Sequence, residues 1–164
     1  MHLLQLVYLM LPVYLANMAP PFVKYWHGWN PPISVALLGS HKTVIGFSMG
    51  IAVAVITTFV QFRIGWEGSL LRTGHWYDTG IAAGVGAMAG DSIKSFFKRR
   101  LEIPPGQRWI PFDQLDFILG GLVALHFFIP LSWTDIVLIC AVSFVGDVLA
   151  NHVSFYLGIR ETQW

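Results

Sequence analysis

Five long apolar stretches limit this chain to folds in which most of its length crosses a lipid bilayer. They cover residues 3–23, 43–62, 77–97, 115–129 and 135–157. A helix needs about 20 apolar residues to cross a bilayer. Only 12% of the 164 residues are charged, against about 25% in soluble domains. The sequence therefore predicts one all-α, polytopic membrane domain over residues 1–164, with about five transmembrane helices.

The stretches differ in how well they suit a continuous helix. The first contains Pro12 and the Pro20-Pro21 pair, which predict a kink or a break in its second half. It has neither a basic start nor a small-residue cleavage site, so we expect a retained span and not a signal peptide. The third stretch is rich in glycine, at Gly80, Gly84, Gly86 and Gly90. Small residues at this density predict close approach of neighbouring helices.

Lysine and arginine residues predict the orientation, because short cytoplasmic loops of membrane proteins carry an excess of both. With five spans, one side of the membrane receives Lys24, Lys42, Lys94, Lys98, Arg99, Arg100, Arg108 and Arg160. The other side receives only Arg63 and Arg72. The first side is therefore predicted to be cytoplasmic, with the N-terminus outside the cell membrane and the C-terminus inside.

The segment 90–116 concentrates charge between two predicted spans. Four of its residues are spaced i, i+3, i+4 and i+7, so they share one face of a helix: Asp91, Lys94, Ser95 and Lys98. A carboxylate beside two ammonium groups and a hydroxyl suits a divalent cation that carries phosphates. Asp113 and Asp116 follow a Pro-Gly turn and are predicted to complete the metal site. The basic run 98–100 could also be explained without a binding role, as the positively charged residues that mark the cytoplasmic end of a membrane span.

A second candidate for phosphate binding lies at the start of the second stretch. Lys42 and Thr43 lie between Gly39 and Gly46, and they offer a cation, a hydroxyl and free backbone N–H groups, which suit phosphate. Their spacing is not that of a GxxxxGK[ST] loop. A capped helix start with a lysine that reaches the interface explains the same residues, so both interpretations stay open.

Other polar residues give weaker signals. Asp78 lies at the end of its stretch far from segment 90–116, and a structural role is favoured for it. Asp147 lies inside the last stretch, where a metal ligand and a structural carboxylate are equally consistent with its position. The histidines lack metal-ligand spacing. The sequence shows no catalytic triad order, dinucleotide turn or nucleic-acid-binding motif.

Three short patterns resemble the membrane CDP-lipid synthases, the phosphatidate cytidylyltransferase family. They are Gly90-Asp91, Ser95-x-x-Lys98-Arg99 and Pro111-x-Asp113-x-x-Asp116. The archaeal branch, the CDP-archaeol synthases, is the more similar, in its small size, five spans, Lys-Thr loop, Lys-Arg-Arg run and Pro-Gly turn. Bacterial and eukaryotic members carry His-Gly-Gly before Asp-Arg-x-Asp. Here residues 110–112 are Ile-Pro-Phe, and Gln114 stands at the arginine position.

The resemblance implies transfer of a cytidylyl group from CTP to an isoprenoid ether lipid phosphate, 2,3-bis-O-geranylgeranylglycerol 1-phosphate, with Mg²⁺ and at the cytoplasmic face. The products would be CDP-archaeol and pyrophosphate. The catalytic residues would be Asp91, Lys98, Asp113 and Asp116, with the three aspartates as the metal ligands. The CTP phosphates would contact Lys42, Thr43, Lys94, Ser95, Lys98 and Arg99.

Three alternatives stay open at this point. One is a CDP-diacylglycerol synthase that acts on phosphatidic acid. Another is a noncatalytic membrane scaffold, which predicts no metal dependence. The third is a small membrane transporter, which would explain intramembrane aspartates and glycine-rich helices. A transporter would not explain why the charges concentrate in one segment at the interface.

Overall fold

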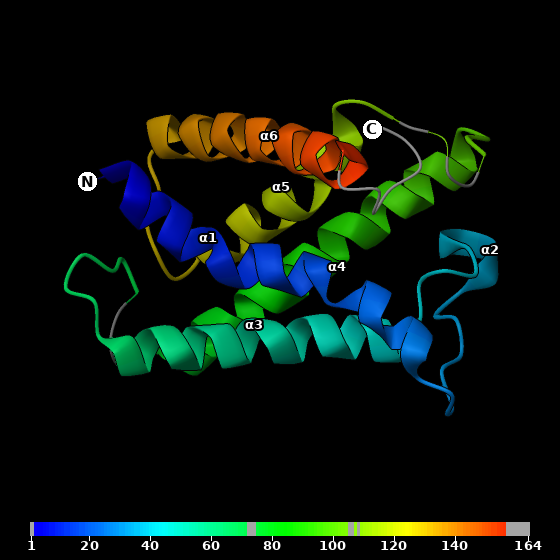
Figure 1. Cartoon of the computed structure of the whole chain (residues 1–164), viewed down its shortest axis with the longest axis horizontal. Coiled ribbons are helices and arrows are strands. Elements are labelled where there is room, and N and C mark those ends of the chain that lie inside the picture. The colour runs from blue at the N-terminus through cyan, green and yellow to red at the C-terminus, as the bar shows by residue number, and fades with distance from the viewer. Residues whose placement is uncertain (1, 72–74, 105–106, 108, 157–164) are drawn as a thin grey trace.

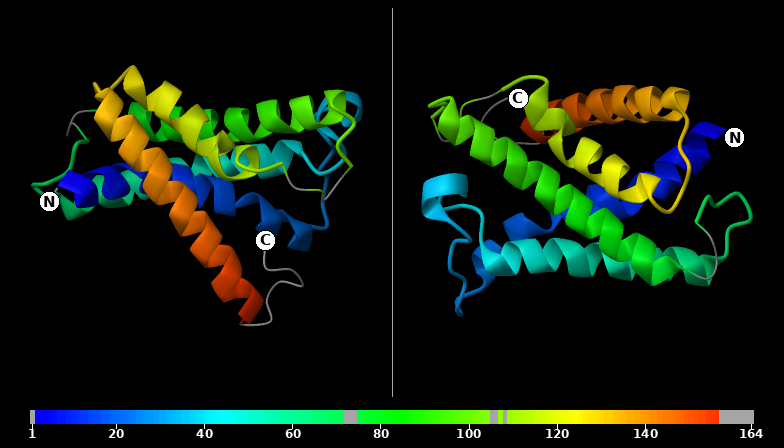
Figure 2. Two further views of the ribbon diagram at one scale, coloured as in Figure 1. Left: turned by 90° about the horizontal axis from the view of Figure 1, so that it is seen from above. Right: turned by 180° about the vertical axis from the view of Figure 1, so that it is seen from behind.

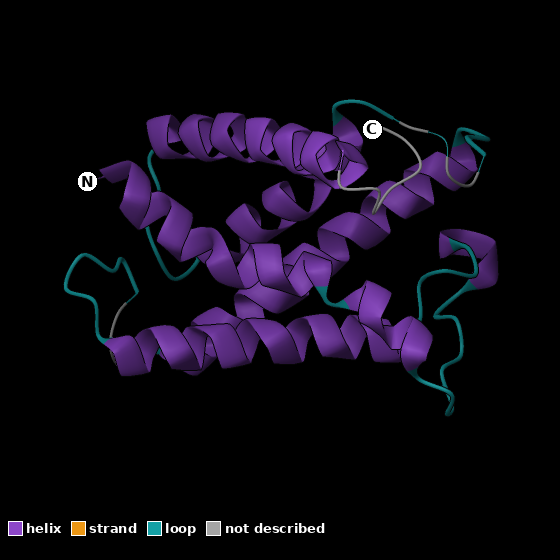
Figure 3. Ribbon diagram, in the orientation of Figure 1, coloured by secondary structure: helices purple, strands orange, loops and turns teal. Residues whose placement is uncertain are grey.

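The computed structural model describes residues 2–71, 75–104, 107 and 109–156, and helices with no strand build this part of the chain (Figure 3). The elements are α1 (His2–Met18), the 3₁₀ helix η1 (Pro20–Tyr25), α2 (Val35–Leu38), α3 (Val44–Ile64), α4 (Trp76–Arg100), α5 (Phe112–His126) and α6 (Trp133–Tyr156). The five long helices run alternately in opposite directions (Figure 1). The described residues of segments 19–43, 101–104 and 109–111 therefore lie at one end of the molecule, called the basic end below.

Within the described residues, three segments are long and apolar enough to cross a membrane: His2–Val23, Val44–Ile64 and Trp133–Ala150. The predicted third and fourth stretches also form helices, α4 with 25 residues and α5 with 15. Helix α5 spans only about 22 Å at 1.5 Å per residue, less than the hydrocarbon core of about 30 Å. The all-α prediction is confirmed. The count of five spans and the membrane orientation stay predictions.

The predicted break in the first stretch is confirmed, because α1 ends at Met18 and η1 begins at Pro20. Pro12 lies inside α1 and has no N–H to donate to the carbonyl of Tyr8, four residues earlier. Gln61 of α3 replaces that donor, since its Nε2 donates to the Tyr8 carbonyl at 2.6 Å. The buried Gln61 side chain therefore ties α3 to the weak point of α1.

We expect Gln61→Leu to lower the free energy of unfolding by about 1 kcal/mol, because the Tyr8 carbonyl then loses its donor. Thermal unfolding of the purified protein in detergent measures the effect. Thr57→Val is the matched control, since the Thr57 hydroxyl bonds only within its own helix, to Val53. Equal melting temperatures for Gln61→Leu and the parent protein would contradict this role.

Helix α4 packs between α3 and α5, and glycine makes both contacts close (Figure 1). A Cβ atom on Gly84 would lie 2.7 Å from the Ile51 Cα of α3, and one on Gly86 would lie 2.5 Å from the Gly120 carbonyl oxygen of α5. The predicted packing role of the glycines is confirmed. The close approach brings the first turns of α5 beside the last turns of α4.

Helix α1 supplies much of the core that supports this arrangement, through Leu6, Leu9, Met10 and Val13. Helix α6 joins the bundle through its first half, where Ser143 hydrogen-bonds Tyr14 of α1 with 2.8 Å between the hydroxyl oxygens. Its second half diverges from the other helices (Figure 2). Among the described residues, α4 packs against α5, α3, α1 and α2, and not against α6.

Candidate active site at the basic end

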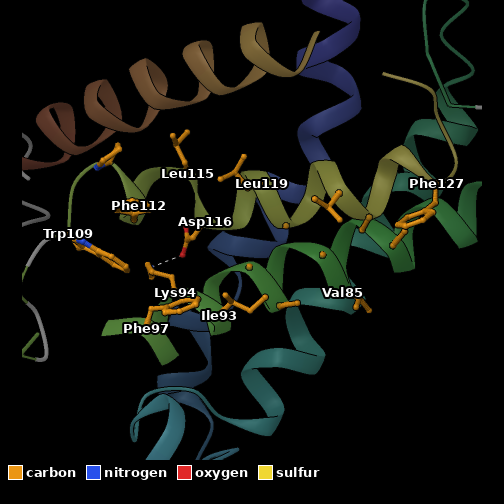
Figure 4. Close-up of a pocket in the computed structure, with 18 of the residues that line it drawn as sticks. Val85, Ile93, Lys94, Phe97, Trp109, Phe112, Leu115, Asp116, Leu119 and Phe127 are labelled. Carbon is orange, nitrogen blue, oxygen red and sulfur yellow. Dashed lines mark ion pairs between the residues drawn. The ribbon is translucent and has the colours of Figure 1, made fainter. Parts of the chain in front are cut away.

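The Lys94 ammonium is the centre of the charged cluster. Its Nζ lies 2.7 Å from Asp116 Oδ2, 3.2 Å from Asp91 Oδ1 and 3.4 Å from Asp113 Oδ1. Figure 4 shows Lys94 and Asp116 facing each other across the space between α4 and α5. The three aspartates predicted to act together therefore do converge, and they converge on a lysine.

Asp113 also organises the segment between α4 and α5. Its carboxylate oxygens each accept a bond from Lys98 Nζ at 3.0 Å, and Oδ2 accepts the Trp109 N–H at 2.7 Å. Lys98 also donates to the carbonyl of Gln107 at 2.6 Å. Lys98, predicted to contact phosphate, thus links Gln107 to the first turn of α5.

Two residues of the first loop, Lys42 and Thr43, are predicted to contact phosphate. Lys42 forms an ion pair with Asp91 through Oδ2, the carboxylate oxygen that does not face Lys94. Thr43 is the N-cap of α3, where its hydroxyl accepts the Gly46 N–H at 3.2 Å. The cap geometry matches the structural interpretation of Thr43. The ion pair gives Lys42 a place in the charged cluster as well.

Ser95 and Arg99 complete the predicted set. The buried Ser95 hydroxyl donates to the Asp91 carbonyl of its own helix at 2.9 Å. Arg99 lies one turn further along α4, and its buried Nε has no hydrogen-bond partner among the described residues. A buried guanidinium N–H without an acceptor is suited to binding an anion.

The charges of the cluster balance formally. Asp91 pairs with Lys42, Asp113 with Lys98, and Asp116 with Lys94, so three carboxylates face three ammonium groups. These side chains are 5–25% exposed, so solvent screens the ion pairs less than it screens surface pairs.

The donor set of the cluster suits Mg²⁺, which prefers carboxylate and phosphate oxygens and binds few protein ligands. Asp116 Oδ1 is buried and has no hydrogen-bond partner within the described residues, so it retains capacity to bind a cation. As the side chains stand, no three His, Cys, Asp or Glu groups in the described ranges are arranged to hold a metal ion. Lys94 Nζ lies between the three aspartates instead.

An apolar groove of about 1000 Å³ begins at the cluster and follows the line between α4 and α5 (Figure 4). At one end, called the charged end below, Lys94 and Asp116 line it together with the aromatic rings of Phe97, Trp109 and Phe112. Ile93 and Leu119 line its middle, and Phe127 lines its far end.

Asp91 also lines a second, small pocket of about 60 Å³, in which His41, Lys42 and Ser92 lie beside apolar residues such as Phe47 and Met88. The charged cluster thus lies between an apolar groove and a small pocket of mixed character.

The sequence did not locate the apolar groove expected for the lipid chains, and the central position of Lys94 was not predicted. Ala82, Gly86, Ala89 and Ile93 all line the groove and follow one another at spacings of three or four along α4. That stripe was present in the sequence, but it also fits a surface that contacts lipid or another helix. Asp78, for which a structural role was favoured, lies at the opposite end of α4 and pairs there with His75 at 3.1 Å.

Comparison with known proteins identifies the family of the chain. The chain matches the family described as CarS-like CDP-archaeol synthase over residues 1–164. CDP-archaeol synthases of Saccharolobus islandicus and Methanospirillum hungatei are 31% and 30% identical to it. The two alignments cover 99% and 94% of this chain, and 96% and 100% of those proteins.

A solved structure of an intramembrane enzyme for archaeal membrane lipid biosynthesis is also similar. It matches with a TM-score of 0.69 and 29% identity, over 91% of this chain and 94% of that one. The chain therefore belongs to the CDP-archaeol synthase family, membrane-embedded transferases of archaeal lipid biosynthesis.

Proposed function

We propose that this protein transfers the cytidylyl group of CTP to 2,3-bis-O-geranylgeranylglycerol 1-phosphate, giving CDP-archaeol and pyrophosphate. One observation carries the proposal: the apolar groove is lined near one end by Lys94 and Asp116 of the charged cluster. A lipid with long hydrocarbon chains and a phosphate head group combines an apolar part and a charged part in the same way as this groove. Its chains would occupy the groove between α4 and α5, with the phosphate beside Lys94.

In the reaction, an oxygen of the lipid phosphate attacks the α-phosphorus of CTP. The bond between the α-phosphorus and the bridging oxygen breaks, and pyrophosphate leaves with the electron pair. Such a transfer needs alignment and charge stabilisation more than a covalent nucleophile. Lys42 and Lys94, which both pair with Asp91, would supply positive charge to the phosphates. Arg99, about two turns beyond Asp91 along α4, would add a third positive group. Lys98 contributes through Asp113 and the segment that it holds in place.

Asp91, Asp113 and Asp116 are the residues that would hold Mg²⁺. When bound, the ion would neutralise phosphate charge and help to align the attacking and leaving oxygens. Thr43 and Ser95 would support the phosphate site through the helix start and the helix turn that they stabilise. With the predicted orientation, the basic end faces the cytoplasm, where CTP is available.

The test of the function is transfer of label from CTP into lipid by the purified protein with Mg²⁺. Parallel reactions contain the archaeal ether lipid phosphate or phosphatidic acid. Label in the organic phase with the ether lipid supports the proposal, and a preference for phosphatidic acid would identify a CDP-diacylglycerol synthase. Absence of transfer to either lipid, in protein that is folded and monodisperse, would overturn the proposal. The membrane transporter would then be the favoured alternative.

The groove assignment gives a selective prediction. We expect Val85→Trp, which places a large side chain in the groove, to raise the KM for the lipid about tenfold. The KM for CTP should stay unchanged, because Val85 lies almost two helical turns from Asp91. Ile56→Trp on the exposed face of α3 is the control for an added tryptophan. Equal increases in both KM values would contradict the assignment of the lipid chains to this groove.

A further inference from the structure

The Lys94 ammonium occupies the position between three carboxylates at which a cation would be expected. We propose that Lys94 serves as a built-in cation in the nucleotide-free protein, and that a divalent cation enters the cluster only together with a nucleotide. On binding, Lys94 would turn from the aspartates to the phosphates. The inference rests on the proposed function, since it concerns the same nucleotide and metal site.

The geometry supports this role because one atom contacts all three acidic groups. Lys94 Nζ lies within 3.4 Å of Asp91, Asp113 and Asp116, which come from two different helices. An ammonium group has three N–H donors and no acceptor. It can therefore link three carboxylates that would otherwise repel one another across the contact of α4 with α5.

Charge balance explains why metal and nucleotide would bind together. The three aspartates are already matched by Lys42, Lys94 and Lys98. A divalent cation alone would add positive charge to a partly buried cluster that is formally neutral, which is unfavourable. A nucleoside triphosphate carries more negative charge than one divalent cation carries positive charge. The complex of the two therefore arrives as an anion, and the lysines that leave the aspartates can pair with it.

Lys94 has the structure needed to move. Its ammonium is carried on a flexible four-carbon chain, and its side chain is 17% exposed and lines the charged end of the groove (Figure 4). Lys98 differs, because it is also bonded to the Gln107 carbonyl and to both oxygens of Asp113. Removing Lys98 thus takes away one positive charge but leaves the Lys94 ammonium between the aspartates.

This difference gives a matched test with Mn²⁺ as the probe, measured by electron paramagnetic resonance on purified protein. Without nucleotide, we expect Lys94→Met to bind Mn²⁺ about tenfold more tightly than the parent, because the space and one balancing charge are released. Lys98→Met should stay within about threefold of the parent. In the parent, a non-hydrolysable CTP analogue should tighten Mn²⁺ binding by about tenfold or more. If Lys94→Met is not monodisperse, Lys94→Gln takes its place.

Three results would overturn the inference. They are no gain of Mn²⁺ affinity in Lys94→Met, an equal gain in Lys98→Met, or an Mn²⁺ affinity of the parent that the CTP analogue does not change. The equal gain would show that net charge alone sets the affinity. The experiment is separate from turnover. Normal transfer by the parent with no metal effect in Lys94→Met would defeat only this inference. The expected metal effect in a protein without transfer would defeat only the proposed function.

Discussion

Asp116→Asn is expected to reduce transfer of label from CTP to lipid by about a thousandfold while the protein stays folded. Asparagine keeps the shape of the side chain and removes its charge. Asp116 is the most buried of the three aspartates, with its side chain 5% exposed, and it makes the shortest contact with Lys94. It also lines the end of the groove where the lipid phosphate would lie. A lost charge at this position cannot be replaced by solvent.

The measurement combines the transfer assay with size-exclusion chromatography and thermal unfolding of the same preparation. Asp78→Asn is the matched control, because Asp78 lies on the same helix but at its other end, paired with His75. We expect the control to keep its activity within about twofold, as is usual for an exposed pair. Full activity in Asp116→Asn would remove this residue from the proposed metal ligands.

Much of the fold was predictable because the start and end of each long helix depend on nearby residues of the sequence. Apolar length located the five long helices, and Pro20 located the end of the first. The short helix α2 was not predicted, since Val35–Leu38 has too few residues to show a period. It forms where the Ser34 hydroxyl accepts the Leu37 N–H at 3.3 Å, and it packs against α4. That packing depends on a neighbour that the local sequence does not specify.

The sequence predicted which residues gather at the site, but not which of them contact one another. Helical spacing placed Asp91, Lys94 and Lys98 on one face of α4, and the structure confirms that face. Spacing does not determine which side chain lies at the meeting point of two helices. The central place of Lys94 depends on how closely α5 approaches, and on the segment that positions Asp113. Ser95 shows the same limit, because its hydroxyl bonds to its own helix.

The close approach of α5 gives the second large expected effect. We expect Gly90→Ala to lower the free energy of unfolding by about 3 kcal/mol and transfer activity by about a hundredfold. Alanine ordinarily stabilises a helix relative to glycine by about 1 kcal/mol, so a loss must come from packing. A Cβ atom on Gly90 would collide with the Asp116 carbonyl oxygen and lie 3.2 Å from the Gly120 Cα. Helix α5 would have to move away, and Asp116 would move with it.

Thermal unfolding and the transfer assay, on the same preparation, separate the two parts of this effect. Gly146→Ala in α6 is the control, because a Cβ there would have no described neighbour within 4 Å; it should be as stable as the parent or slightly more stable. Loss of activity without loss of stability in Gly90→Ala would mean that α5 shifts at little cost and that the position of Asp116 matters most. Unchanged stability and activity would mean that the contact of α4 with α5 does not set the geometry of the site.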